Sequence, residues 1–279
     1  MQQAGSIGPA LDAKRLVAHA LGWSDLQLAT REHDRVDPAM AERVAGLLGR
    51  RIVGESVARI IGEREFYGLP IRLNAATLEP RPETELLVDL AIKALPQGGM
   101  LLDLGTGSGC IPVAVLANRP DATAVAVDLS AEALHCAREN AVLTGVGGRI
   151  AFLEGNWFEP LNRPLLSPGG GREAVAPPFD LIVSNPPYIA SAIIPTLSPE
   201  VRDFDPALAL DGGPDGLAPY RIIASQAGEW LKPGGQLLLE IGFDQAVGVT
   251  GLLHAAGFEQ IGVLQDLNAL DRVVRAHHF

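Results

Sequence analysis

Hydrophobic side chains recur every three to four residues in the first part of the chain, which is the spacing of an amphipathic helix. The pattern predicts helices over Pro9–Trp23, Pro38–Ile52 and Glu55–Ile61. Short helices with short connections favour a compact helical bundle. The alternating segment Phe66–Leu78 then predicts a hairpin or an extended linker.

From Met100 onward, short apolar runs alternate with helical segments. The pattern predicts strands over Met100–Leu104, Thr123–Val127, Arg149–Leu153, Phe179–Ser184 and Gln236–Ile241. It predicts helices over Cys110–Ala117, Ala131–Leu143, Gly216–Leu231 and Gln245–Ala256. This alternation indicates an α/β fold, with a parallel sheet covered by helices on both faces.

Three further segments complete this outline. Prolines and acids in Glu79–Glu85, followed by an apolar run, are typical of a helix start. The segment Arg163–Pro178 is rich in proline and glycine and is predicted to be a surface loop. The last two strands, Glu259–Asp266 and Arg272–His277, are joined by a connection too short for a crossover, so we expect an antiparallel pair.

Composition narrows the classes of protein that the chain can be. With 279 residues, 47% of them hydrophobic, the chain is long enough for one large and one small domain. A net charge of −11 disfavours general binding to phosphate backbones, so we expect no direct nucleic-acid partner. Two cysteines make no disulfide framework, and no Cys/His cluster has metal-ligand spacing, so we expect no metal. No signal peptide or membrane-length apolar run is visible, and a cytoplasmic monomer without membrane contact is the default expectation.

Three glycines follow the first strand of the predicted sheet, in the segment Asp103–Gly109. Glycines let the backbone turn sharply and let a ligand approach without meeting a Cβ atom. The next strand ends in Asp128, at the place where an acid that accepts hydrogen bonds from ribose hydroxyls is expected. A tight turn without a ligand is the simpler alternative, but Asp128 favours a nucleoside-containing cofactor.

The glycine spacing discriminates between two such cofactors. A dinucleotide pyrophosphate needs G-x-G-x-x-G, whereas this loop reads G-x-G-x-G. S-adenosyl-L-methionine has no pyrophosphate, so a tighter loop suits it. The candidate cofactor-binding residues of these two segments are Gly105, Thr106, Gly107, Ser108, Gly109 and Asp128.

Three more residues are candidates for the same site. Asp103 precedes the glycines, where a carboxylate disfavours a phosphate and is suited to orient the loop or to meet the cationic amino group of the methionine portion. Asn156 and Trp157 end the third strand, where a polar group is suited to adenine's edge and an aromatic ring to its face. The simpler alternative for Trp157 is a core residue.

The fourth strand ends directly in Asn185, Pro186, Pro187 and Tyr188. The prolines end the strand and fix the backbone, so that nearby carbonyls point in set directions. The Asn185 side-chain oxygen and the Pro186 carbonyl are two acceptors suited to a planar nitrogen with two N–H donors, and Tyr188 supplies a flat surface. We predict these four residues as the catalytic segment for methylation of an amide or amino nitrogen, and glutamine and adenine both fit this pattern.

With these residues in view, the chain resembles the HemK-type (PrmC-type) methyltransferases, which modify a glutamine side-chain nitrogen in peptide chain release factors. The resemblance covers nearly the whole chain. It rests on blocks at Gly62–Gly68, Pro80–Glu85, Asp103–Gly109, Asn185–Tyr188 and Leu208–Arg221, and on Asp128.

The resemblance implies a seven-stranded, Rossmann-like S-adenosyl-L-methionine-dependent methyltransferase sheet with a small N-terminal helical domain. It implies a helical substrate-recognition domain over residues 1–62, a hairpin or linker over 63–80 and a methyltransferase domain over 81–279. It also implies cofactor contacts from the glycine loop, Asp128, Trp157 and Asn185. The acceptor is implied to be the glutamine of a Gly-Gly-Gln tripeptide in release factors, held by Asn185–Tyr188.

The chain departs from the family pattern at two positions. Glu79 stands where an apolar residue is usual, and Asn156 stands where an acid is common. Two rival functions remain: glutamine methylation of a ribosomal protein, and N6-methylation of adenine in nucleic acid. The segment Pro80–Glu85 argues against the first by resemblance. The acidic charge disfavours the second, because an enzyme that extracts a base needs a basic groove.

Overall fold

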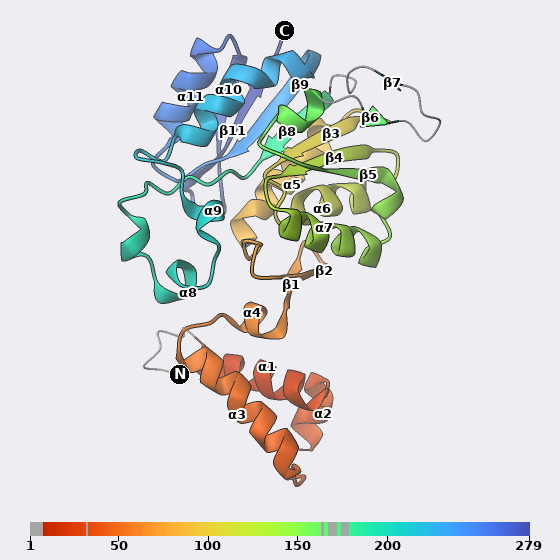
Figure 1. The fold of residues 1–279 in the computed structure, drawn as a ribbon, viewed down its shortest axis with the longest axis vertical. Coiled ribbons are helices and arrows are strands. Elements are labelled where there is room, and N and C mark those ends of the chain that lie inside the picture. The colour runs from red at the N-terminus through yellow and green to blue at the C-terminus, as the bar shows by residue number, and fades with distance from the viewer. Residues whose placement is uncertain (1–7, 32, 163–164, 167–171, 174–178) are drawn as a thin grey trace.

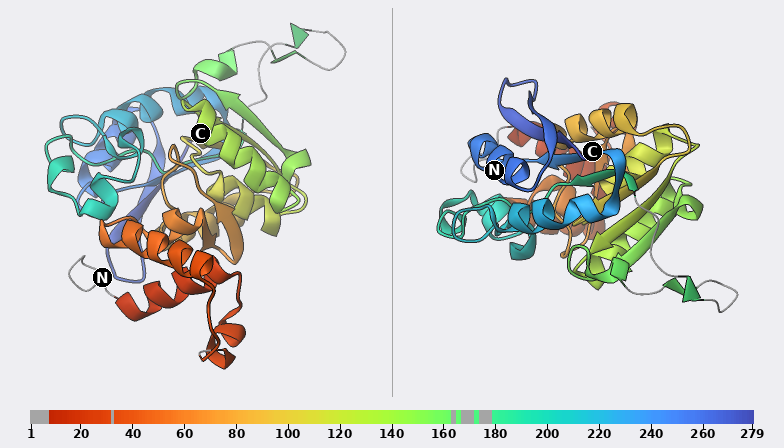
Figure 2. Two further views of the ribbon diagram at one scale, coloured as in Figure 1. Left: turned by 60° about the horizontal axis from the view of Figure 1, so that its bottom comes forward. Right: turned by 90° about the horizontal axis from the view of Figure 1, so that it is seen from above.

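The protein is described from a computed structural model, which covers residues 8–31, 33–162, 165–166, 172–173 and 179–279. It begins with four helices: α1 (Pro9–Leu21), α2 (Asp25–Thr30), α3 (Pro38–Ile52) and α4 (Val57–Ile61). In Figure 1 and in the left view of Figure 2, α1, α2 and α3 form a group of their own at one end of the molecule. The three predicted helices are confirmed. The sequence pattern missed α2, a six-residue helix that starts with a capping box between Ser24 and Gln27.

A hairpin follows the helices. Its strands are β1 (Glu63–Phe66) and β2 (Leu69–Arg72), and Tyr67 and Gly68 form the turn, with φ values of 54° and 74°. The predicted hairpin is thus present, but it starts three residues before the predicted Phe66. The reason is that most of β1 is charged and only its last residue is buried, so no apolar alternation marks it.

Seven strands form the main sheet in the order β10-β11-β9-β8-β3-β4-β5. Their bounds are β3 Met100–Leu104, β4 Thr123–Asp128, β5 Ile150–Glu154, β8 Phe179–Ser184, β9 Leu231–Glu240, β10 Glu259–Gln265 and β11 Asp271–His277. β11 is antiparallel to both of its neighbours, β9 and β10, and the other pairs in the sheet are parallel. The predicted parallel sheet and its antiparallel pair at the end of the chain are confirmed.

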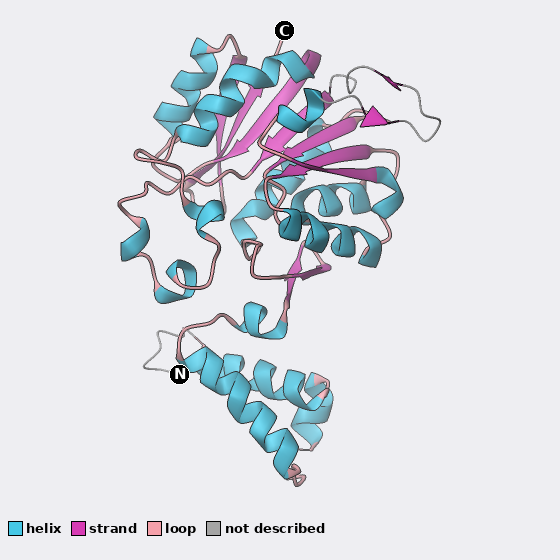
Figure 3. Ribbon diagram, viewed as in Figure 1, coloured by secondary structure: helices cyan, strands magenta, loops and turns pink. Residues whose placement is uncertain are grey.

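Helices cover both faces of this sheet (Figure 3). The longer ones are α5 (Glu85–Ala94), α6 (Cys110–Asn118), α7 (Ala131–Leu143), α10 (Ala218–Trp230) and α11 (Ala246–Ala255). Successive strand residues point to opposite faces. Leu101 therefore packs in a cluster with α5 and α6, and Leu102 packs in a second cluster with α10 and α11. No helix in the described part of the chain is long and apolar enough to cross a membrane.

Short elements occupy the connections. They are α8 (Pro199–Arg202), α9 (Ala207–Leu210) and the 3-10 helices Pro82–Thr84, Gly147–Arg149, Glu159–Asn162 and Ile194–Thr196. Most of the predicted surface loop 163–178 lies outside the described residues. Within it, β6 (Leu165–Leu166) and β7 (Arg172–Glu173) pair in antiparallel fashion.

Two buried carboxylates tie α4 to the rest of the chain. Asp205 accepts hydrogen bonds from Arg59 of α4 at 2.5 Å and from Arg81 at 2.7 Å. Glu79, which is only 4% exposed, accepts one from the Ser56 hydroxyl at 2.5 Å and another from Arg64. Glu79, which stands where the family pattern has an apolar residue, is therefore buried with both carboxylate oxygens hydrogen-bonded.

Candidate active site

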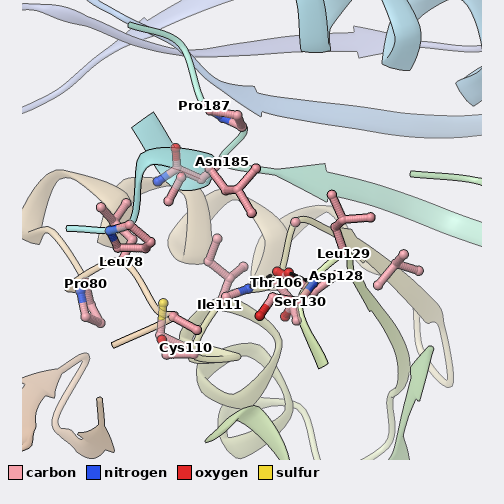
Figure 4. Close-up of a pocket in the computed structure, with 18 of the residues that line it drawn as sticks. Leu78, Pro80, Thr106, Cys110, Ile111, Asp128, Leu129, Ser130, Asn185 and Pro187 are labelled. Carbon is pink, nitrogen blue, oxygen red and sulfur yellow. Dashed lines mark hydrogen bonds between the residues drawn. The ribbon is translucent and has the colours of Figure 1, made fainter. Parts of the chain in front are cut away.

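A pocket opens at the carboxyl ends of β3, β4, β5 and β8, where ligands bind in open α/β sheets (Figure 4). The loops after these strands form one wall. The segment before α5 and the α9 region form the other. The predicted site residues that line the pocket are Gly105, Thr106, Gly107, Ser108, Asp128, Asn156, Trp157, Asn185 and Pro187.

The glycine loop takes a conformation that favours glycine. Gly105, Gly107 and Gly109 have φ values of 72°, 56° and 76°, in the region that side chains with a Cβ rarely adopt. A Cβ atom at Gly109 would lie 2.9 Å from the Cβ of Ala137, whereas one at Gly107 would meet nothing within 4 Å. Gly107 thus keeps backbone open to the pocket. Gly109 lies outside the pocket lining and lets α6 pack closely against α7.

Asp128 fixes the loop from the end of β4. Its Oδ2 accepts the Gly107 N–H at 2.7 Å, and its Oδ1 accepts the Ser130 N–H at 2.9 Å. Burial raises the pKa of Asp128, and these backbone donors partly offset that shift. Each oxygen keeps a lone pair, so the carboxylate can still accept hydrogen bonds from two hydroxyl groups in the pocket.

Asp103 lies beneath the loop and does not line the pocket. It is fully buried, and burial raises its pKa to about 7. Neither of its oxygens has a hydrogen-bond partner among the described residues. The Thr106 hydroxyl is near enough to lower the Asp103 pKa, but the geometry falls short of a hydrogen bond. A buried carboxyl of this kind changes its charge near neutral pH.

Trp157 and Asn156 occupy the wall after β5. Trp157 has a φ of 47°, and its ring would be 3.7 Å from a Cβ placed on Gly105. The same ring packs against the core cluster on the α10 side, so it serves both the core and the pocket. Asn156 is exposed, and its amide reaches Glu159 at 3.5 Å.

The segment after β8 divides between pocket and core. Asn185 and Pro187 face the pocket (Figure 4), whereas Pro186 and Tyr188 are not in its lining. The Tyr188 ring packs on the core, its backbone oxygen accepts from Gln245 at 2.9 Å, and burial raises its pKa to about 12. Asn185 Nδ2 donates to Thr84 Oγ1 at 3.3 Å.

Sequence patterns missed much of the second wall. The lining residues of that wall that we did not single out include Leu78, Arg81, Thr84, Pro206, Leu208 and Ala209. Helix and strand periodicity carries no signal for them, because they lie in connections or in the short helix α9. Four of them, Arg81, Thr84, Leu208 and Ala209, fall within the blocks Pro80–Glu85 and Leu208–Arg221, which the resemblance rests on.

Two family models match the chain. One is described as the PrmC N-terminal domain and matches residues 1–62. The other is described as the methyltransferase small domain and matches residues 82–196, which include the glycine loop and Asn185.

Curated relatives match over nearly the whole chain. A release factor glutamine methyltransferase of Agrobacterium fabrum is 42% identical over 280 residues, covering 98% of this chain and 92% of the relative. One of Cereibacter sphaeroides is 45% identical over 273 residues, with the same coverage of 98% and 92%. Among solved structures, a methyltransferase from Pyrococcus furiosus matches with a TM-score of 0.53 at 15% identity. That match covers 84% of this chain and 98% of the other, and it supports the fold alone.

Proposed function

The chain belongs to the release factor glutamine methyltransferase family, and we propose that it methylates the glutamine side-chain nitrogen in the Gly-Gly-Gln segment of peptide chain release factors. The methyl donor would be S-adenosyl-L-methionine. One observation carries the proposal. The Asn185 side chain lines the same pocket as the glycine loop and Asp128, so a methyl acceptor at Asn185 lies beside a cofactor held by the loop.

The residues of the pocket fit this cofactor. Gly107 leaves open space above its backbone, and the Asp128 carboxylate is held by two backbone donors with lone pairs left for ribose hydroxyls. Trp157 offers a ring face for the adenine, and Asn156 offers an amide for its edge. When bound, the cofactor supplies a methyl group on a positively charged sulfur.

The acceptor side of the pocket fits an amide nitrogen. That nitrogen is a weak nucleophile because its lone pair is delocalised into the carbonyl group. Since Asn185 Nδ2 is engaged by Thr84, its Oδ1 is left to accept one N–H of the substrate, and the Pro186 carbonyl would accept the other. Both acceptors orient the nitrogen and favour the positive charge that builds up on it, so the chain acts by positioning and electrostatics and not as a strong base.

We also propose residues 1–62 as the part that recognises the protein substrate, with 63–80 as the connection to the methyltransferase domain. Ala76, Leu78, Glu79 and Pro80 of that connection line the pocket, and Arg81 follows directly after them. The contacts of Arg59 with Asp205 and of Ser56 with Glu79 hold α4 against this wall. A protein bound by the helices would therefore lie near this wall of the pocket.

The test offers labelled S-adenosyl-L-methionine and three acceptors in separate reactions: a release factor, a preparation of ribosomal proteins, and DNA or RNA. We expect label in the release factor alone. Label only in ribosomal protein would keep glutamine methylation as the reaction but would contradict release factors as the substrate. Label only in nucleic acid would overturn the assignment of the acceptor to glutamine.

A further inference from the structure

Glu240 is a buried carboxyl group that the proposed function leaves without a role. It ends β9 and is 1% exposed, and its Oε2 has no hydrogen-bond partner among the described residues. Burying a carboxylate without full pairing costs stability. A side chain that is costly to the fold and lies next to a reactive group is a candidate for a functional role.

The sheet register brings Glu240 beside Asn185. β8 and β9 are parallel, with Ser184 opposite Leu239, so Asn185 and Glu240 are the next residues at the same edge of the sheet. Thr84, which is 2% exposed, reaches this place from the segment before α5. It accepts the Asn185 amide at 3.3 Å. Three side chains from three segments therefore meet at one side of the pocket.

The charges around Glu240 agree with this placement. Burial raises the pKa of Glu240 to about 7, and the Thr84 hydroxyl and the Asn185 amide both lie near enough to lower it in part. Arg272 of β11 also lowers the Glu240 pKa, and Glu83 raises it. The Asn185 amide thus borders a group that carries negative charge when it is ionised.

We infer that Glu240 and Thr84 are positioning residues, which turn the Asn185 amide so that Nδ2 points into the protein and Oδ1 points to the methyl acceptor. This inference rests on the proposed function. A carboxylate attracts the NH₂ end of an amide and repels its oxygen. If the amide were turned over, its N–H donors would face the N–H donors of the substrate, and the acceptor nitrogen would lose its orientation.

The test uses matched substitutions at both positions. Thr84→Val removes the hydroxyl and keeps the shape, whereas Thr84→Ser keeps the hydroxyl. Glu240→Met removes the carboxyl oxygens, whereas Glu240→Gln keeps one oxygen acceptor.

We expect the Val and Met variants to lower kcat by about tenfold or more, with the cofactor Kd changed by less than about threefold. The Ser and Gln variants should recover most of kcat. Thr250→Val, on α11, is the control for the loss of a half-buried threonine hydroxyl away from the site.

The unfolding temperature separates positioning from structural support. Since Glu240→Met removes a buried, poorly paired carboxyl, it should unfold at or above the temperature of the wild type while being slower in catalysis. A variant that loses activity only in proportion to its stability would overturn the inference. Loss of cofactor binding to the same degree as kcat would also overturn it, by making Thr84 or Glu240 a cofactor residue.

A second readout does not depend on the substrate. In a protein with ¹⁵N-labelled asparagine side chains, Asn185→Asp assigns the Asn185 amide signal by removing it. We expect that amide to exchange its protons more slowly than the exposed Asn156 amide, and to lose this protection in the Val and Met variants. Unchanged protection in both variants would overturn the inference. If the wild type methylates no release factor, the proposed function fails, and the amide exchange still decides whether Glu240 and Thr84 hold Asn185.

Discussion

Asn185 Nδ2 donates to Thr84 Oγ1 at 3.3 Å, and this contact joins the residue after β8 to the residue before α5. The two residues are 101 positions apart in the chain, and both line the pocket. The proline-rich segment before α5 and the Asn-Pro-Pro-Tyr segment are therefore two parts of one site. In the proposed function, Asn185 presents its side-chain oxygen to the substrate, and Thr84 holds the amide group that carries this oxygen.

Asn185→Ala should separate catalysis from cofactor binding. Removing one preorganised group that stabilises developing charge lowers kcat by about 10²- to 10³-fold. The glycine loop and Asp128 remain, so the Kd for S-adenosyl-L-methionine should change by less than about threefold. Single-turnover rates and calorimetric titration measure the two quantities. Asn118→Ala, on the outer surface of α6, is the control and should leave both unchanged. Equal losses of turnover and cofactor affinity would make Asn185 chiefly a cofactor residue.

Two glycine variants test the loop conformation. Gly107→Ala and Gly109→Ala both force a Cβ into a positive φ, of 56° and 76°, at a cost of about 1 kcal/mol each. Only at Gly109 does the new Cβ also meet Ala137, at 2.9 Å. Urea unfolding should therefore show a loss for Gly109→Ala that exceeds the loss for Gly107→Ala by about 1–3 kcal/mol. Equal losses would contradict the close contact of α6 with α7.

Asp205→Ala tests the connection between α4 and the sheet domain. The Asp205 side chain is 2% exposed and pairs with Arg59 and Arg81. Its removal leaves the buried Arg59 guanidinium without a carboxylate partner, so the free energy of unfolding should fall by about 3–5 kcal/mol. Asp203→Ala is the matched control, because Asp203 pairs with Arg202 on the surface and is 45% exposed. That variant should unfold at nearly the wild-type urea concentration. Equal effects of the two substitutions would contradict the buried network.

Glu240 should make stability depend on pH. Burial raises its pKa from the ordinary 4.5 to about 7, so the folded chain binds this proton more tightly than the unfolded chain does. Proton binding at Glu240 makes its full favourable contribution to the free energy of unfolding below about pH 4.5. This contribution is lost as the pH rises through about 7. Glu240→Gln has no such proton. Its free energy of unfolding, relative to the wild type, should rise by about 2 kcal/mol between about pH 5 and about pH 8.

The pH series has an internal control. Asp103 also has a pKa raised to about 7, but it is present in both the wild type and Glu240→Gln. Its effect therefore cancels when the free energy of unfolding of one is subtracted from that of the other. A difference that stays flat or falls with rising pH would show that Glu240 is not protonated in the folded state at low pH.

The sequence predicted the sheet and one wall of the pocket, for reasons that are local. The strands before Gly105 and Asn185 are buried on both faces, so they read as apolar runs, and the backbone at Gly105 needs glycine. The carboxyl ends of parallel strands share one edge, so the places of Asp128 and Trp157 follow from the strand assignments. Resemblance, and not periodicity, supplied the identity of the methyl acceptor.

The second wall could not be predicted in this way. Thr84 and Pro206 reach the pocket only because of how α5 and α9 pack, which no local pattern records. No local pattern marks Glu240 as a buried acid. It is buried at the end of β9, which lies inside the sheet between β8 and β11. The short connection predicted the antiparallel pair, but it gave no signal for which of the two strands pairs with β9.

Mass mapping of a release factor after incubation with the protein and S-adenosyl-L-methionine tests the central claim most directly. The account predicts one added methyl group on the glutamine of the Gly-Gly-Gln segment. It predicts none on a release factor whose segment reads Gly-Gly-Glu, and a rate lower by about 10²-fold or more with Asn185→Ala. A methyl group on any other residue, or equal methylation of the Gly-Gly-Glu variant, would contradict it.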